Sequence, residues 1–243
     1  MKQNVFIVST YVLGFILLNI GVAGYIILNP DILDNEALFT QISITANTLF
    51  YFATALIITI LFRKYILEQL KDFTGRIKQM LAIVTTGLVG IYLISFVLGI
   101  ILTLLGVTEE AANQQSIIDM LEASTPLQFA LMIIFITVLA PIVEEIVFRK
   151  GVYGIVGKIS QNFLNNRDMD PKKSHLIANI IAIAISSLIF GAIHAVDVYI
   201  LIYAGLGVAL GTDYYMSNKN VFAAICVHIL YNSISIILTL LVF

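Results

Sequence analysis

Long apolar runs are the feature that most constrains this chain. Seven segments of about 18 or more mostly apolar residues follow one another, each long enough to cross the hydrocarbon core of a bilayer as a helix. They cover residues 5–28, 37–62, 80–105, 127–148, 176–196, 198–216 and 221–242. Of the 243 residues, 60% are hydrophobic and only 12% are charged, which is unlike a soluble domain. The sequence therefore predicts an all-α fold, a polytopic transmembrane helical bundle of about seven spans.

The charges between these runs predict an orientation. Lysine and arginine follow the second, fourth and sixth runs, whereas the loops after the first and third runs are acidic and include Glu109 and Glu110. Cytoplasmic loops are enriched in Lys and Arg, so we expect a multi-pass protein of the cell membrane with a cytoplasmic N-terminus and an external C-terminus. Residues 63–79 and 106–126 are each expected to be a short interfacial helix or a solvated loop. The net charge of −2 gives no sign of nucleic-acid binding.

Three of the apolar segments carry polar residues that hydrophobic packing alone would not select. Ionisable groups in hydrocarbon cost several kcal/mol unless they are paired or wetted, so each one is a candidate functional residue. The residues concerned are Glu144, Glu145 and Arg149 in the first segment, Phe190 and His194 in the second, and His228 and Asn232 in the third.

Helical spacing gives the two adjacent glutamates different surroundings. On a helix, Glu145 and Arg149 share one face and can form an ion pair, while Glu144 points about 100° away. Glu144 is then left free to act as a general base. Phe190 is placed to pack beside His194, four residues later. Together the three segments provide a base, a group that can hold a water and donors for an oxyanion, which amide hydrolysis requires.

The ordered motifs Glu-Glu-x-x-x-Arg, Phe-x-x-x-His and His-x-x-x-Asn resemble the CPBP family, which includes the type II CAAX prenyl endopeptidases and bacteriocin-processing (Abi) proteins. The resemblance covers about residues 125 to 242. It implies an intramembrane, glutamate-dependent endopeptidase. The roles that it implies are Glu144 as the base that activates a water, His194 as a second group holding that water, His228 and Asn232 as oxyanion donors, and Glu145 with Arg149 as a supporting pair.

The resemblance also divides the chain. Residues 1–124 are interpreted as N-terminal transmembrane helices without a recognised motif, and residues 125–243 as the catalytic core of one continuous membrane domain. The expected partners are the lipid bilayer and a membrane-associated peptide or protein substrate, including a lipid-anchored one, in CAAX-type processing or in peptide or bacteriocin maturation. Helix faces rich in Gly and Ala could pack within one chain or between two, so the oligomeric state stays open.

Other interpretations of the same residues are retained. Glu145 and Arg149 could be a purely structural pair, and His228 and Asn232 could form interhelical hydrogen bonds. Two histidines and a glutamate could bind zinc, although there is no His-Glu-x-x-His motif and we expect no cofactor. The whole chain could instead be a non-catalytic membrane scaffold or bacteriocin-immunity protein of the same fold. A transporter is disfavoured because the charges cluster in the C-terminal half and no inverted repeat is found.

The predicted spans conflict with the predicted site. Glu144 falls toward the cytoplasmic end of its span and His194 toward the external end of the next, roughly 20 Å apart in depth at 1.5 Å per residue. A shared water requires span four to be disturbed at Pro141, or span five to end early near Gly191. We expect a wet cleft among spans four to seven that opens to the cytoplasm, and we expect Asp213 to snorkel to the interface.

Overall fold

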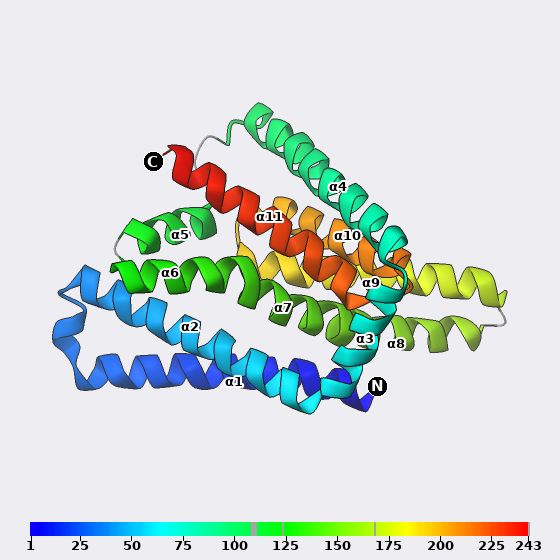
Figure 1. Cartoon of the computed structure of the whole chain (residues 1–243), viewed down its shortest axis with the longest axis horizontal. Coiled ribbons are helices and arrows are strands. Elements are labelled where there is room, and N and C mark those ends of the chain that lie inside the picture. Colours follow the sequence, from blue (N-terminus) through cyan, green and yellow to red (C-terminus); the bar gives the residue numbers. More distant parts are fainter. Residues whose placement is uncertain (108–110, 123, 168, 243) are drawn as a thin grey trace.

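The computed structural model describes residues 1–107, 111–122, 124–167 and 169–242, and in these residues it contains helices and no β-strand. Glu109 and Glu110 lie outside the described residues. The elements in chain order (Figure 1) are α1 (Lys2–Leu28), η1 (Pro30–Ile32), α2 (Glu36–Leu61), α3 (Arg63–Gly75), α4 (Ile77–Leu104), α5 (Ala112–Glu122), α6 (Pro126–Ile134), η2 (Phe135–Leu139), α7 (Ala140–Glu145), η3 (Ile146–Tyr153), α8 (Gly154–Asn165), α9 (Pro171–His194), α10 (Ile200–Met216) and α11 (Val221–Val242). The predicted all-α polytopic bundle is confirmed.

Six helical stretches in the described part of the chain are long and apolar enough to cross a membrane. The sixth predicted span, 198–216, is instead the 17-residue helix α10. At about 26 Å, α10 is shorter than the hydrocarbon core of about 30 Å. It packs against α9 and α4, which buries part of its apolar surface, including Leu206 and Leu210. The count of seven full spans is therefore corrected to six long helices and one short one.

The fourth span is much longer than predicted. A continuous helical stretch runs from Pro126 to Asn165, 40 residues and about 60 Å, where the sequence predicted 127–148. Its last part, α8, packs against the start of α9, and the two project from one end of the bundle (Figure 1). The helix α9 begins at Pro171, directly after its N-cap residue Asp170, and not at residue 176 as predicted. The charged residues Arg149 and Lys150 ended the predicted apolar run at residue 148, but a charged residue does not end a helix.

Two π-helical segments, η2 and η3, flank α7 and its glutamates. In η2 the Ala140 N–H bonds to the carbonyl of Phe135, five residues earlier. The next carbonyl, Ile136, would take its bond from residue 141, which is a proline without an N–H. Nδ2 of Asn232 on α11 donates to Ile136 instead, at 2.9 Å. The predicted disturbance at Pro141 is present as a π-helical register, a feature that often marks functional sites.

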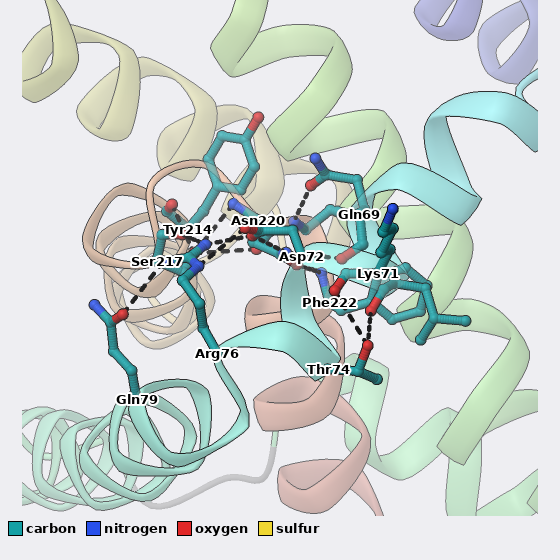
Figure 2. A network of polar contacts seen from close by, with 12 residues as sticks. Gln69, Lys71, Asp72, Thr74, Arg76, Gln79, Tyr214, Ser217, Asn220 and Phe222 are labelled. Atoms are coloured by element: carbon teal, nitrogen blue, oxygen red, sulfur yellow. Dashed lines mark hydrogen bonds and ion pairs between the residues drawn. The ribbon is translucent and has the colours of Figure 1, made fainter.

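Both segments predicted as interfacial helices or loops are helical, as α3 and α5. The helix α3 is bonded to the turn before α11 (Figure 2): Nδ2 of Asn220 donates to Oδ2 of Asp72 at 2.7 Å and to the carbonyl of Gln69 at 2.9 Å. Arg76 pairs with Asp72 and donates to the carbonyl of Ser217 at 3.0 Å. These bonds join the N-terminal half of the chain to the start of the helix that carries His228 and Asn232.

The two ends of the bundle differ in charge. The N-terminus, α3, the α8–α9 hairpin and the turn between α10 and α11 lie at one end (Figure 1), and the lysines and arginines of the connecting segments lie on these elements. The turn between α1 and α2, which carries Asp31 and Asp34, lies at the opposite end with α5 and the C-terminus. The charge asymmetry that the sequence suggested is therefore also an asymmetry in space.

Candidate active site

Three of the predicted site residues meet in the middle of the bundle. Oε2 of Glu144, on α7, lies 3.8 Å from Nε2 of His194 and 3.9 Å from Nε2 of His228. The separation of roughly 20 Å in depth, inferred from the predicted spans, is therefore wrong. Glu144 lies in the middle of the 40-residue helix, and α9 ends at His194, where extended backbone at Ala195 follows. Polar atoms at such distances can be bridged by one water molecule.

Glu145 holds two partners and faces away from the cavity. Its Oε2 accepts from Nε of Arg149 at 2.7 Å, and its Oε1 lies 3.0 Å from Nδ1 of His228. Glu145 and Arg149 are both fully buried, where an unpaired charge would cost several kcal/mol. An ionised carboxylate can only accept, so Nδ1 of His228 carries the proton and Nε2 faces Glu144. The predicted ion pair is present, and it also fixes the orientation of His228.

His194 is held between two aromatic rings. Its Nδ1 donates to the carbonyl of Phe190 at 2.8 Å, which turns Nε2 toward Glu144. The Phe190 ring lies 4.4 Å from the imidazole and the Tyr203 ring stacks on it at 5.1 Å, centroid to centroid. The predicted contact with Phe190 is thus present, and the stacked Tyr203 ring adds a second contact that the sequence did not predict. Gly191 allows α10 to approach, since a Cβ there would lie 2.8 Å from the carbonyl oxygen of Ile200.

Asn232 lines the same cavity as Glu144, His194 and His228. Its bond to Ile136 shows that the interhelical hydrogen bond, one of the retained interpretations, exists. A side-chain amide has two N–H donors, so one of them is left for a ligand.

The cavity has a volume of about 800 Å³ and is lined by helices from both halves of the chain. From Glu144 it extends toward α5, where Asn113 and Gln114 line it, and no described lining residue comes from α3 or α8. On the other side of Glu144, the buried side chains of Ile146 and Val147 close the bundle. The lining residues therefore place the cavity on the α5 side of Glu144 and not toward the basic end where the cleft was expected. Which of the two ends faces the cytoplasm stays a prediction.

Two tyrosines of the N-terminal half complete the surroundings of Glu144. The Tyr51 hydroxyl, on α2, donates to Oε1 of Glu144 at 3.2 Å, and the Tyr11 hydroxyl, on α1, lies 3.2 Å from that of Tyr51. Neither residue was predicted from the sequence, because tyrosine within an apolar run is typical of packing or of the membrane interface.

Asp213 does not snorkel to the interface as expected. It is 6% exposed and occupies the space that Gly87 of α4 leaves, where a Cβ would lie 2.1 Å from its Oδ2. In the described part of the chain, Oδ2 of Asp213 and Nη1 of Arg149 are both buried without a hydrogen-bond partner. Asp213 therefore belongs to the buried polar layer behind Glu145.

The site combines an acid and two imidazoles that face the cavity, a buried ion pair behind them and an amide donor. This combination is that of a membrane-embedded hydrolase, which is the class of protein that the fold and site define. No group of three or more His, Cys, Asp or Glu side chains among the described residues is arranged to hold a metal ion.

Comparison with known proteins narrows this class to a family. Residues 126–234, which include every site residue predicted from the sequence, match the family described as type II CAAX prenyl endopeptidase Rce1-like. This part of the chain is therefore similar to that family over all the predicted site residues, and the chain is an intramembrane endopeptidase.

Two relatives agree with this assignment. YdiL of Bacillus subtilis (strain 168), named as a candidate membrane peptidase, is 25% identical over 251 residues, covering 98% of this chain and 90% of YdiL. The membrane-embedded CAAX protease MroQ of Staphylococcus aureus (strain USA300) is 33% identical over 109 residues, covering 45% of this chain and 39% of MroQ. No solved structure matches the chain.

Proposed function

We propose that Glu144 is the general base of a glutamate-dependent peptide-bond hydrolysis. One observation carries the proposal: Oε2 of Glu144 faces Nε2 of both His194 and His228 within 4 Å, while Glu145 is occupied by Arg149 and His228. Of the two adjacent carboxylates, only Glu144 lines the cavity. It is therefore the one that can take a proton from a water molecule there.

In the proposed reaction, a water held between Glu144 and His194 loses a proton to Glu144 as its oxygen bonds to the scissile carbonyl carbon. The carbonyl oxygen becomes an oxyanion and accepts hydrogen bonds from Nε2 of a doubly protonated His228 and from the N–H of Asn232 that does not bond to Ile136. Glu144 then gives its proton to the leaving nitrogen. The carbon–nitrogen bond breaks, and a carboxylic acid and an amine leave.

Glu145 and Arg149 act behind the reacting atoms. The Glu145 carboxylate balances the charge of the doubly protonated His228 ring, and Arg149 keeps Glu145 ionised and in place. The fully buried position of both residues supports this role.

The proposed substrate is a membrane-associated peptide or protein, including one that carries a lipid anchor. The cavity supports this class because apolar side chains line most of it, while Asn47, Asn113 and Gln114 supply amide groups that could bind a peptide backbone. In the proposed orientation the basic end, with the N-terminus, is cytoplasmic. The substrate then reaches Glu144 from the side of α5, toward the external surface.

The test is an N-terminal and peptide profile of cells carrying the wild type, Glu144→Gln or Glu68→Gln, matched for membrane abundance and repeated with a chelator. Glu68 is an exposed residue of α3 and serves as the matched control. Cleavage products found with the wild type and Glu68→Gln, lost with Glu144→Gln and retained in chelator, support the proposal. Loss of the products in chelator would instead assign the activity to a metal. Equal profiles for all three chains would overturn the proposal and favour a binding function.

A further inference from the structure

The hydroxyls of Tyr11 and Tyr51 form a directed chain of hydrogen bonds that ends on Glu144. The Tyr51 hydroxyl lies 3.2 Å from Oε1 of Glu144, and the Tyr11 hydroxyl lies 3.2 Å from that of Tyr51. An ionised carboxylate only accepts, so Tyr51 gives its one proton to Glu144. Tyr11 must then be the donor to Tyr51. A hydroxyl that accepts one bond while donating another is polarised and becomes a stronger donor.

Packing holds the Tyr51 ring in this position. Its ring centroid lies 4.9 Å from that of Phe135 and 5.2 Å from that of Phe50, both in edge-to-face geometry. Phe135 begins η2, in the same continuous helix as Glu144. The donor and the carboxylate are therefore fixed against each other by contacts that do not depend on the hydroxyl.

The chain makes the two oxygens of Glu144 unequal. Oε1 accepts from Tyr51, whereas Oε2 faces Nε2 of His194 and of His228. Without Tyr51, the carboxyl group could rotate and either oxygen could face the water. With Tyr51 in place, the oxygen next to both imidazoles is the one that takes the proton.

We propose that Tyr51 is a positioning residue for Glu144, strengthened by Tyr11, so that residues 1–124 supply part of the active centre. This inference rests on the proposed role of Glu144 as the base. The titratable and charged groups around Glu144 are Tyr51 from α2, Tyr11 from α1, His194 from α9, His228 from α11, and Glu145 with Arg149 on its own helix.

The test compares Tyr51→Phe, Tyr11→Phe, Tyr25→Phe and Glu144→Gln, each purified into lipid nanodiscs and assayed on the peptide that the Glu144-dependent profile identifies. Tyr25 lies on α1 with Tyr11 but is exposed, so Tyr25→Phe should behave as the wild type. Tyr51→Phe should lower kcat about tenfold with KM unchanged, because a bond to a charged group is lost. Its pH–rate profile should also differ from that of the wild type on the acid side, because the lost hydrogen bond had favoured the ionised carboxylate. Tyr11→Phe should change kcat and the pH–rate profile in the same direction as Tyr51→Phe, but by less.

The outcomes separate the two proposals. Tyr51→Phe with the kcat and pH profile of the wild type, beside an inactive Glu144→Gln, would overturn the positioning role alone. A change in KM alone would make Tyr51 a substrate-binding residue and would also overturn it. An active Glu144→Gln would overturn the proposed function itself. If Tyr51→Phe fails to fold, Tyr11→Phe decides, supported by a shift in the infrared carboxylate band that Glu144→Gln removes.

Discussion

At the scale of single residues, two neighbouring carboxylates have opposite surroundings. Glu145 is fully buried between Arg149 and His228, and its loss would leave a buried guanidinium without its partner. Glu144 lines the cavity and has no Arg or Lys partner among the described residues. One helical step therefore separates a residue that stabilises the fold from one that can react.

This difference predicts different outcomes for two equivalent substitutions. Glu145→Gln should lower the free energy of unfolding by about 3 kcal/mol, because one partner of a buried ion pair is removed. Glu144→Gln should abolish cleavage and leave that free energy within about 0.5 kcal/mol of the wild type. Denaturation of the purified protein in detergent, beside the peptide assay, measures both. Equal destabilisation by the two variants would contradict this account.

At the scale of elements, close helix packing behind the site depends on small residues. A Cβ on Gly207 of α10 would lie 2.8 Å from Cα of Ser187 on α9, and a Cβ on Gly87 of α4 would lie 2.1 Å from Oδ2 of Asp213. Side-chain-free positions of this kind let membrane helices approach closely. They bring α10 against both α9 and α4 and so support the end of α9, where His194 lies.

Gly87 and Gly90, two of the three glycines of α4, form a matched pair. Gly87→Ala should destabilise the protein by about 1–3 kcal/mol, because the new methyl group displaces a buried carboxylate. Gly90→Ala should have no such cost, since a Cβ there meets nothing within 4 Å. Thermal unfolding of the two variants in the same detergent is the measurement. The packing argument is wrong if Gly90→Ala is as damaging as Gly87→Ala.

At the scale of the whole molecule, the N-terminal half is bonded to the C-terminal half at the basic end. Hydrogen bonds lower the pKa of Asp72 below its ordinary value of 3.8. The bond from the Arg76 guanidinium has the largest effect, and the bond from Asn220 has the next largest. A carboxyl group with a lower pKa in the folded state contributes stability above its unfolded pKa. That stability is lost as the pH falls through the folded pKa.

Acidification below about pH 4 should therefore weaken the attachment of α3 to the turn before α11. Wild-type protein should lose thermal stability over this range, and Asp72→Asn should lose less because it never had the charged bond. Asp31→Asn, at the opposite end of the molecule, is the control. If the melting temperatures of wild type and Asp72→Asn decline in parallel, Asp72 does not contribute in this way.

The separation of charge between the two ends predicts which surface faces the cytoplasm. In a Cys226→Ser background, a cysteine at Asp34 should react with a membrane-impermeant maleimide in intact cells, and one at Lys64 only after the membrane is opened. The reason is that basic segments are retained on the cytoplasmic side. Labelling of the Lys64 position in intact cells would reverse the orientation and with it the proposed side of substrate entry.

The sequence by itself determined the helical bundle, the three motif-bearing segments and the Glu145–Arg149 pair. A bilayer requires each backbone polar group to be bonded within its own helix, and residues four apart share a helix face in any fold. These features depend on local geometry and can be derived from spacing alone.

Only the tertiary structure decided where the site lies in depth, which way its cavity extends and which residues complete it. The predicted hydrophobic runs ended at residue 148 and began again at residue 176, whereas the helices continue to Asn165 and begin at Pro171. The depth of a residue in the membrane could therefore not be counted from the runs. Tyr51 meets Glu144 from a position 93 residues away, and Asp213 meets a gap left by Gly87. Such contacts follow from how helices pack against each other, and packing leaves no periodic signal in one sequence.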